Sequence, residues 1–328
     1  MKSYGMNRTL IAFLMIFISS SAFCQETDYG PGYQTIMVSN PAFTGSSGES
    51  MLKLSYLNFF PGNHYNFHSV FFSQESYYPV LHGGAGIYVS DDYIGGIVND
   101  LRGGVAYSYF LRAGEDLYIN AGLSASFFHR GFNFSDAVLP DQIDALGGIT
   151  LPSSQILTDS RRTVFDVGTG FLAMTGNIVA GFSITHLAEP DLSGTGSSVE
   201  RLRRKYSLTF LGGFDPGKNE KLLIRPLASL AIQGGYLSAA AGAILESRNL
   251  GFNSVFIFGN NKNIDFIAGF SFRSDLLTLY YNYRFNIKSQ SLTLPFSMAQ
   301  QAGVAFSLNK LNNVEKRIKG KTINAPGL

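Results

Sequence analysis

The histidines are the residues whose type most readily supports chemistry. They are His64, His68, His82, His129 and His186. His64 and His68 have a spacing that brings two metal ligands together on a helix. They lie in an alternating, strand-like stretch, where residues four apart share a face but stand about 13 Å apart. We therefore favour polar roles on a strand over metal binding.

Acidic residues occur in pairs at Asp91-Asp92 and at Asp141 and Asp144. They could form a carboxylate pair or a Ca²⁺ site, but no second oxygen-rich segment follows at ligand spacing, so solvation in loops is favoured. The chain has no GxSxG turn for a nucleophilic serine. The glycines at 83–86 and 168–170 precede no helical pattern that could hold a phosphate. The sequence therefore predicts a protein that is not an enzyme, with no cofactor and no metal.

The stretch from Val164 to Asp191 shows which kind of element carries such residues. Alternate residues from Phe165 to Ala173 form a largely apolar face, and the pattern repeats over Ile178–Ile184 after the turn formers Thr175-Gly176-Asn177. This period of two predicts a β-hairpin. A water-soluble sandwich would show the same pattern, but the unit recurs along nearly the whole chain. Large apolar residues on one face and Gly, Ser, Asn and Thr on the other favour a transmembrane barrel with a polar lumen.

The predicted fold is all-β, a transmembrane antiparallel β-barrel of the outer membrane with about fourteen strands over residues 51–308. The high glycine content supports it, and no apolar run of about 18 residues follows the N-terminus, so no membrane helix is expected. The predicted strands are Met51–Phe60, Tyr65–Ser73, Gly83–Ser90, Leu101–Leu111, Leu117–His129, Val164–Met174, Asn177–Leu187, Lys205–Phe214, Lys221–Gln233, Tyr236–Glu246, Leu250–Gly259, Ile264–Arg273, Leu276–Ile287 and Ala299–Leu308.

Strand parity predicts the orientation of this barrel. If the first strand starts at the periplasm, the long connections Arg130–Thr163 and Thr185–Arg204 fall on the outside. Short connections, such as Thr175–Asn177 and Ser274-Asp275, then fall on the periplasmic side, which is the asymmetry typical of outer-membrane barrels. We expect the two long connections to lie side by side above the barrel.

Residues 1–24 predict a secretory signal. Lys2 and Arg8 precede the apolar core Leu10–Ile18, and small residues follow before Cys24. Cleavage after Cys24 would leave a cysteine-free chain, and lipoprotein processing at Cys24 is the less favoured alternative. Without the first two cations the basic and acidic residues are equal in number, so no overall field attracts nucleic acid.

Two segments flank the predicted barrel. Residues 25–50 contain Pro31 and Pro41, which interrupt regular structure, and could form a periplasmic arm or a plug in the lumen. Residues 309–328 carry five basic residues against one acidic residue. We predict a solvated tail there, or a basic arm that touches anionic lipid head groups or a periplasmic partner.

Several short elements follow one another in a fixed order along the chain. They are Asn40-Pro41-Ala42-Phe43-Thr44-Gly45, Tyr56–Ser76, His82–Gly95, Val105–Leu111, Leu139-Pro140-Asp141-Gln142-Ile143-Asp144, Phe165-Asp166-Val167-Gly168 and His186-Leu187-Ala188-Glu189-Pro190. This series resembles the PorP/SprF-like outer-membrane proteins of the type IX secretion system of Bacteroidota. Leu57 stands where that family commonly has Arg, and Phe60 stands where it commonly has Trp.

The resemblance implies an integral outer-membrane component that supports secretion or surface attachment of particular clients, such as adhesins. It also implies contact with periplasmic ring-forming or peptidoglycan-associated subunits. The candidate contact residues are Asn40, Pro41, Leu139, Pro140, Asp141, Gln142, His186, Leu187, Glu189 and Pro190. For His186–Pro190 the structural alternative places His186 near the membrane interface and Glu189 in water, with Pro190 ending the strand pairing. The polar lumen faces keep a diffusion pore or small-solute transporter as the alternative function.

Overall fold

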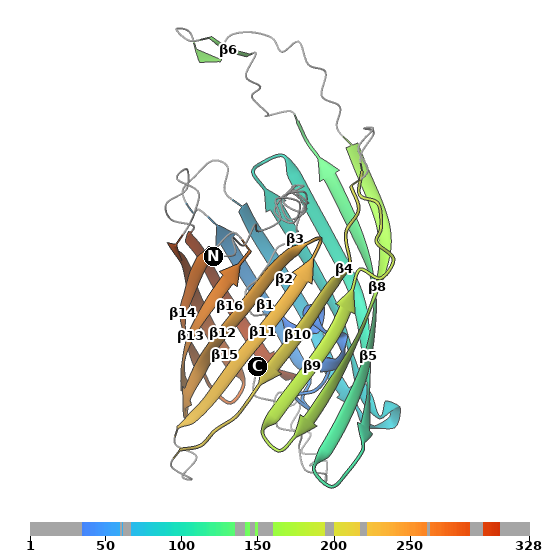
Figure 1. Ribbon diagram of the computed structural model, residues 1–328, viewed down its shortest axis with the longest axis vertical. Helices are drawn as coiled ribbons and strands as arrows, with labels where there is room; N and C mark the ends of the chain where they lie inside the picture. The colour runs from blue at the N-terminus through green and yellow to red at the C-terminus, as the bar shows by residue number, and fades with distance from the viewer. Residues whose placement is uncertain are drawn as a thin grey trace, which may run out of the picture.

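A computed structural model describes residues 35–59, 61, 67–134, 142–144, 148–149, 160–193, 200–216, 222–260, 263–288 and 298–308. Fourteen of its strands form one closed antiparallel barrel (Figure 1). Each of these strands pairs with its neighbours in chain order, and the last pairs with the first. No helix in the described ranges is long and apolar enough to cross a membrane. The predicted fold class and strand number are confirmed.

The barrel strands have the following bounds. They are β1 (Met51–Phe59), β2 (Phe67–Tyr78), β3 (Gly83–Ile94), β4 (Val98–Arg112), β5 (Leu117–Phe132), β8 (Ser160–Thr175), β9 (Ile178–Thr185), β10 (Lys205–Leu211), β11 (Leu223–Gln233), β12 (Tyr236–Ser247), β13 (Leu250–Gly259), β14 (Ile264–Arg273), β15 (Leu277–Lys288) and β16 (Met298–Ser307). Two short strands, β6 (Ile143–Asp144) and β7 (Gly148–Ile149), pair with each other in the connection between β5 and β8, and β6 stands well beyond the rim in Figure 1.

Several strands, including β5, which continues to Phe132 rather than His129, reach further than the sequence predicted at the ends that strand parity places outside, which we call the outer ends. β3 continues to Ile94 rather than Ser90, β4 begins at Val98 rather than Leu101, and β8 begins at Ser160 rather than Val164. Their added residues break the apolar alternation, which is why the pattern did not reveal them. Main-chain pairing continues there because the neighbouring strands extend together, as in the pairing of Asp92 with Asp100.

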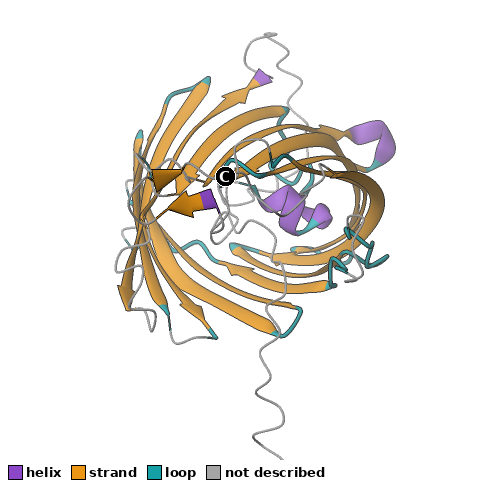
Figure 2. Cartoon of the chain, turned by 90° about the horizontal axis from the view of Figure 1, so that it is seen from above, coloured by secondary structure: helices purple, strands orange, loops and turns teal. Residues whose placement is uncertain are grey.

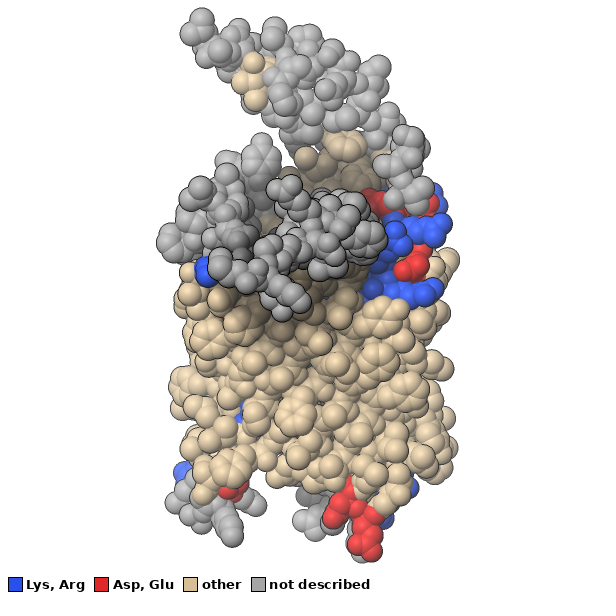
Figure 3. Space-filling view, viewed as in Figure 1, with Lys and Arg blue, Asp and Glu red and all other residues tan. Residues whose placement is uncertain are grey.

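The two faces of each strand differ as the alternation predicts. In β8, Phe165 is 77% exposed on the outside of the barrel, whereas Asp166 next to it is 6% exposed. Figure 3 shows the result on one side of the molecule, where a broad belt with almost no charged residues at its surface separates charged groups near the two rims. An apolar belt between polar rims is the surface expected in contact with lipid.

The lumen is polar along part of its wall. Asn253 donates to Asn282, Asn282 donates to Gln301, and Gln301 donates to Ser55, over distances of 2.8, 2.9 and 3.2 Å. This ladder crosses β14 at Gly269, where a side chain would overlap both asparagines. An apolar cluster on the lumen face includes Leu172 and Val255.

A short segment lies inside the barrel. It consists of the helical turn α2 (Ile36–Ser39) and the 3-10 turn η1 (Pro41–Phe43). Figure 2 shows both turns within the ring of strands, against one side of the wall. Of the two alternatives for residues 25–50, the described part of that segment therefore occupies the lumen. The proposed signal sequence and the basic tail lie outside the described residues.

Cysteine labelling tests the predicted orientation. Arg201→Cys lies in the long connection before β10 and Asn177→Cys lies in the turn between β8 and β9, and both positions are exposed. We expect a membrane-impermeant maleimide to label the first on intact cells and the second only after the outer membrane is opened. The unmodified protein gives the background, and the reverse result would invert the barrel.

Candidate functional site

Asn40 holds the lumenal segment to the wall. Its side-chain oxygen accepts a hydrogen bond from the Ala42 N–H at 2.9 Å, which caps η1. Its side-chain nitrogen donates to the main-chain oxygens of Phe171 in β8 and Phe182 in β9, at 3.4 and 3.3 Å. The side chain is 1% exposed. One asparagine therefore shapes the segment and fixes it across two strands.

Inward-facing glycines make room for this contact. A methyl group at Gly122 in β5 would overlap the main chain of Pro41 and Ala42, and one at Gly170 in β8 would overlap the Asn40 side chain. In β3, a methyl group at Gly84 would overlap the main-chain oxygen of Thr44. Glycine in a strand interior often marks such a close approach of another backbone.

Polar side chains of the wall satisfy the main chain of the segment. Ser183 donates to the Ser39 oxygen at 2.7 Å, Ser108 donates to the Thr44 oxygen at 2.6 Å, and Asn120 donates to the Ala42 oxygen at 3.4 Å. The wall's own N–H and C=O groups pair in the sheet, so a buried segment must find side-chain partners. The segment is thus held by several strands at once.

A second constellation lies on the lumen face near the outer mouth. Arg130 in β5 makes two hydrogen bonds to Asp100 in β4, at 2.7 and 2.8 Å, and a third to Glu200 at 2.7 Å. Arg102 in β4 pairs with Asp92 in β3 at 2.7 Å. We call these five residues the mouth network. It corrects the prediction of loop solvation for Asp91-Asp92, because β3 extends further and places Asp92 inside.

The ring of Phe128 lies between the two arginines of the mouth network. It stands 4.9 Å from the guanidinium carbon of Arg102 and 5.3 Å from that of Arg130. A cation over an aromatic face gains electrostatic stabilisation. Phe128 also packs with Leu192, Leu202 and Val164. The network is therefore joined to the connection between β9 and β10.

That connection covers part of the edge of β8. β9 pairs only with Thr169–Thr175 of β8, and the Leu187 N–H then donates to the Val167 oxygen at 3.1 Å. The Nδ1 atom of His186 lies 2.7 Å from the Asp166 carboxylate, and both side chains are buried. Asp166 and His186 belong to two of the family-like elements, FDVG and HLAEP. Sequence alone placed these elements at the outer ends of one hairpin.

The two long connections meet, as predicted. Arg130 at the outer end of β5 pairs with Glu200, and Arg162 near the start of β8 donates to the Asp191 main-chain oxygen at 2.8 Å. Both contacts join the base of one connection to the other. The described bases of the two connections therefore lie at the same rim and contact each other, as expected, whereas the side of the membrane that this rim faces stays a prediction.

The predicted contact residues fall into two groups along β8. Asn40 and Pro41 are buried in the lumen beside Gly170, and His186 pairs with Asp166. Gly170 and Asp166 both face the lumen and stand about 13 Å apart by strand rise. Leu187, Glu189 and Pro190 continue from His186 and are half-buried. Gln142 precedes β6, and Leu139, Pro140 and Asp141 lie outside the described residues.

Sequence reasoning missed the mouth network, and although it interpreted the glycines at 83–86 and 168–170 as pointing into the barrel, it did not identify the segment for which they make room. The signal of the network was present, because Asp100, Arg102, Arg130 and Asp166 occupy inward positions near the outer ends of their strands. Charged residues at lumen-facing positions of one end can pair across adjacent strands. Among the described residues, no group of three or more His, Cys, Asp and Glu is arranged to hold a metal ion.

The comparison with protein families decides the membership. A family model described as type IX secretion system membrane protein PorP/SprF matches residues 24–312. The chain belongs to the PorP/SprF family. The match includes both the lumenal Asn40-Pro41 element and the mouth network. No curated protein matches this PorP/SprF chain.

Solved structures similar to this PorP/SprF protein are outer-membrane barrels. They include the CymD monoaromatic hydrocarbon channel, with 12% identity, a TM-score of 0.50 and coverage of 86% of this chain and 94% of that one. A TodX deltaS2S3 mutant monoaromatic hydrocarbon channel has 14% identity, a TM-score of 0.50 and coverage of 82% and 93%. A FadL homologue of Pseudomonas aeruginosa has 10% identity, a TM-score of 0.47 and coverage of 84% and 93%. At these identities the likeness to the first two supports the barrel fold alone.

Gly122→Ala tests the contact between the lumenal segment and the wall. The added methyl group would overlap the main chain of Pro41 and Ala42, so we expect a loss of about 1–3 kcal/mol in stability. We also expect faster hydrogen exchange over residues 36–45, measured by mass spectrometry. Gly131→Ala in the same strand is the control, because the nearest neighbour of its added methyl would be 3.9 Å away. Equal stability and exchange in both variants would disprove the close contact.

Arg130→Met tests the mouth network. It leaves the Asp100 carboxylate, which is 2% exposed, without its bidentate partner. Breaking a buried pair from one side costs about 3–5 kcal/mol. We expect this loss in urea unfolding of the barrel in lipid vesicles, and recovery of most of it when Asp100→Asn is added. A double variant no more stable than Arg130→Met would show that the pair is not what stabilises this end.

Proposed function

We propose that this protein is an accessory barrel of the type IX secretion system that supports secretion or surface attachment of specific client proteins, such as adhesins. Family membership and the outer-membrane barrel fold are its basis. The observation that carries the finer statement is the fastening of the connection between β9 and β10. Its base is tied to the wall by Arg130, His186 and Leu192, so it offers outer partners a surface of defined shape.

Buried charges at the mouth support a role for this end of the barrel. Removing Asp100 and Arg130 from water is costly, and apolar residues of similar size often stabilise a protein equally well. The Asp100–Arg130 pair at the mouth is understandable if it serves to hold the connection between β9 and β10 in a fixed place. We infer that the outer connections contact the client.

Periplasmic partners would meet the opposite rim. β1 begins there and β16 ends there, so both ends of the barrel sequence are on the same side. Several turns at this rim are short, as at Gly176-Asn177 between β8 and β9. We propose that this rim and the segments attached to it contact the ring-forming or peptidoglycan-associated subunits of the machinery, and we propose no catalytic role.

The alternative of a diffusion pore makes a different prediction for the lumen. The segment formed by α2 and η1, with Asn40 between them and Thr44 after them, occupies one side of the lumen and is hydrogen bonded to β4, β5, β8 and β9. This supports the accessory role over an open channel. Steady conductance of the purified barrel in planar bilayers would favour the pore instead.

Gene deletion with complementation tests the proposal. We expect deletion to remove particular proteins from the cell surface, as measured by surface labelling and mass spectrometry, and the wild-type gene to restore them. Arg130→Met paired with Asp100→Asn should fold but restore them less completely, because it loses the link to Glu200. Gly131→Ala should restore them fully. A surface profile unchanged by deletion would reject the accessory role.

A further inference from the structure

Exposed basic residues gather at one part of the outer rim. Figure 3 shows this cluster, with a few acidic residues among it, directly above the largely uncharged belt on the side of β8. It begins with Arg161 and Arg162 at the start of β8 and continues over the residues that lead into β10. We call it the rim cluster, which consists of the exposed Arg161, Arg162, Arg201, Arg203 and Arg204 and the half-buried Lys205.

Alternation continues past the end of the barrel and separates two sets of side chains. Glu200 and Leu202 turn toward the mouth, where Glu200 pairs with Arg130 and Leu202 is buried against Phe128. Arg201 and Arg203, the residues between and after them, are exposed. The same stretch therefore ties the connection to the lumen wall and presents cations on its other face.

Nearby carboxylates only partly offset this charge. Asp191 lies 3.7 Å from Arg162, and hydrogen bonds from Ser193, together with Arg162 and Arg201, hold the pKa of Asp191 below its usual range. Glu189 accepts a hydrogen bond from the Arg204 N–H. Among the described residues of these segments, 160–162, 189–193 and 200–205, three acidic residues thus accompany six basic ones, and the third, Glu200, is already paired with Arg130. The cluster keeps a net positive charge.

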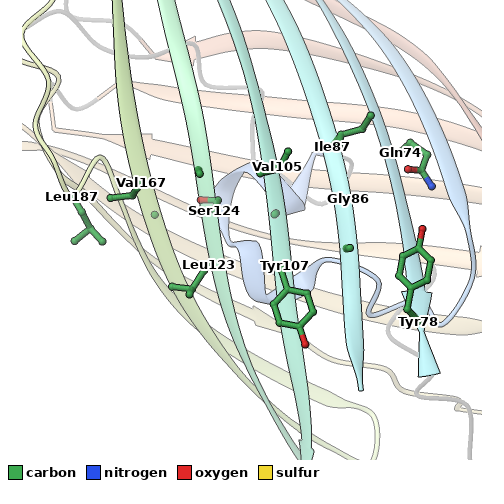
Figure 4. A pocket seen from close by; sticks show the side chains of 14 residues that line it. Gln74, Tyr78, Gly86, Ile87, Val105, Tyr107, Leu123, Ser124, Val167 and Leu187 are labelled. Atoms are coloured by element: carbon green, nitrogen blue, oxygen red, sulfur yellow. The ribbon is translucent and has the colours of Figure 1, made fainter. Parts of the chain in front are cut away.

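Apolar grooves lie on the outer face of the wall next to the rim cluster. Two adjoining grooves of ≈ 720 and ≈ 550 Å³ share Ile87, Val105, Ala125 and Val167. Figure 4 shows the first of them, with side chains from β3, β4, β5 and β8 around it. Because the exposed side chains that line them, such as Ile87, Val105 and Val167, belong to the lipid-facing rows of these strands, the grooves open toward acyl chains rather than water.

One outward row of β8 joins the cations to the groove. Arg161, Phe165 and Val167 lie on the same face of this strand, and about 20 Å of strand separates the first from the last. Leu187 and Ala188 border the grooves and begin the connection that carries Arg201 and Arg203. Cationic and apolar surfaces thus follow each other in the order of a lipid's head group and chains.

We propose that the rim cluster and the grooves bind a phosphorylated glycolipid of the outer leaflet, with its phosphates on the arginines and its acyl chains along the grooves. Arginine suits this role because its planar guanidinium binds phosphate with two parallel hydrogen bonds. The proposal depends on which rim faces outward and does not depend on the secretion role. Bound lipid would lie beside the connection proposed to contact clients.

Lipid binding by the full-length barrel in detergent tests this proposal. The probe is purified diphosphoryl lipid A, and native mass spectrometry measures the bound fraction. With Arg161→Gln, Arg201→Gln and Arg203→Gln combined, we expect affinity to fall about tenfold or more, since each cation near an anionic surface contributes substantially. The control combines Lys288→Gln and Arg248→Asn, which removes exposed cations elsewhere and should leave binding unchanged.

Further measurements separate the contributions of the lipid's phosphates and of its acyl chains to the affinity. Dephosphorylated lipid A should bind the wild type as weakly as diphosphoryl lipid A binds the triple variant, and inorganic phosphate should not compete. Ala125→Trp, which fills both grooves, should weaken binding while the arginines remain. Heat-modifiable migration on SDS gels checks that every variant forms the barrel. Equal binding by the triple variant and the wild type, or equal binding of phosphorylated and dephosphorylated lipid, would overturn the proposal.

Discussion

Closure of the hydrogen-bonded wall is the constraint on which the rest of this structure depends. Within a bilayer no water can satisfy an unpaired main-chain N–H or C=O group, so a sheet that crosses it must have no free edge. Pairing of β1 with β16 removes that edge. Closure also fixes which face of every strand points inward. Each later feature follows from this division into a lipid face and a lumen face.

A closed wall uses its own polar main-chain groups, and this determines how anything inside it is held. The lumenal segment bonds through side chains, with Asn40 reaching two strands and Ser183 and Ser108 donating to its oxygens. The segment can lie this close to the wall only because Gly122 and Gly170 have no side chain. Hydrogen bonds and steric complementarity therefore specify one position for the Asn40-Pro41 element, within a barrel whose strands are otherwise joined only to their neighbours.

The outer end combines two environments in one connection. Glu200, Leu192 and His186 attach it to the lumen side, where the mouth network neutralises buried charge. Arg201 and Arg203 lie on its other face, above the apolar belt. A protein partner at the mouth and a lipid at the rim would thus act on the same short stretch of chain. That proximity gives a physical route by which bound lipid could influence contact with a client.

The sequence by itself determined the fold class, the fourteen strands, their inward and outward faces and the meeting of the two long connections. These follow from a period of two and from strand parity, which are local properties of the chain. Only the tertiary structure decided that Asn40 lies against Gly170, that Asp92 is buried beside Arg102, and that Asp166 meets His186. The first contact joins residues far apart in sequence, and all three depend on where the strands end and on their register. Where polar residues continue a strand beyond the membrane, the apolar pattern shows neither the end of the strand nor its register. Pairing there is decided by the neighbouring strands.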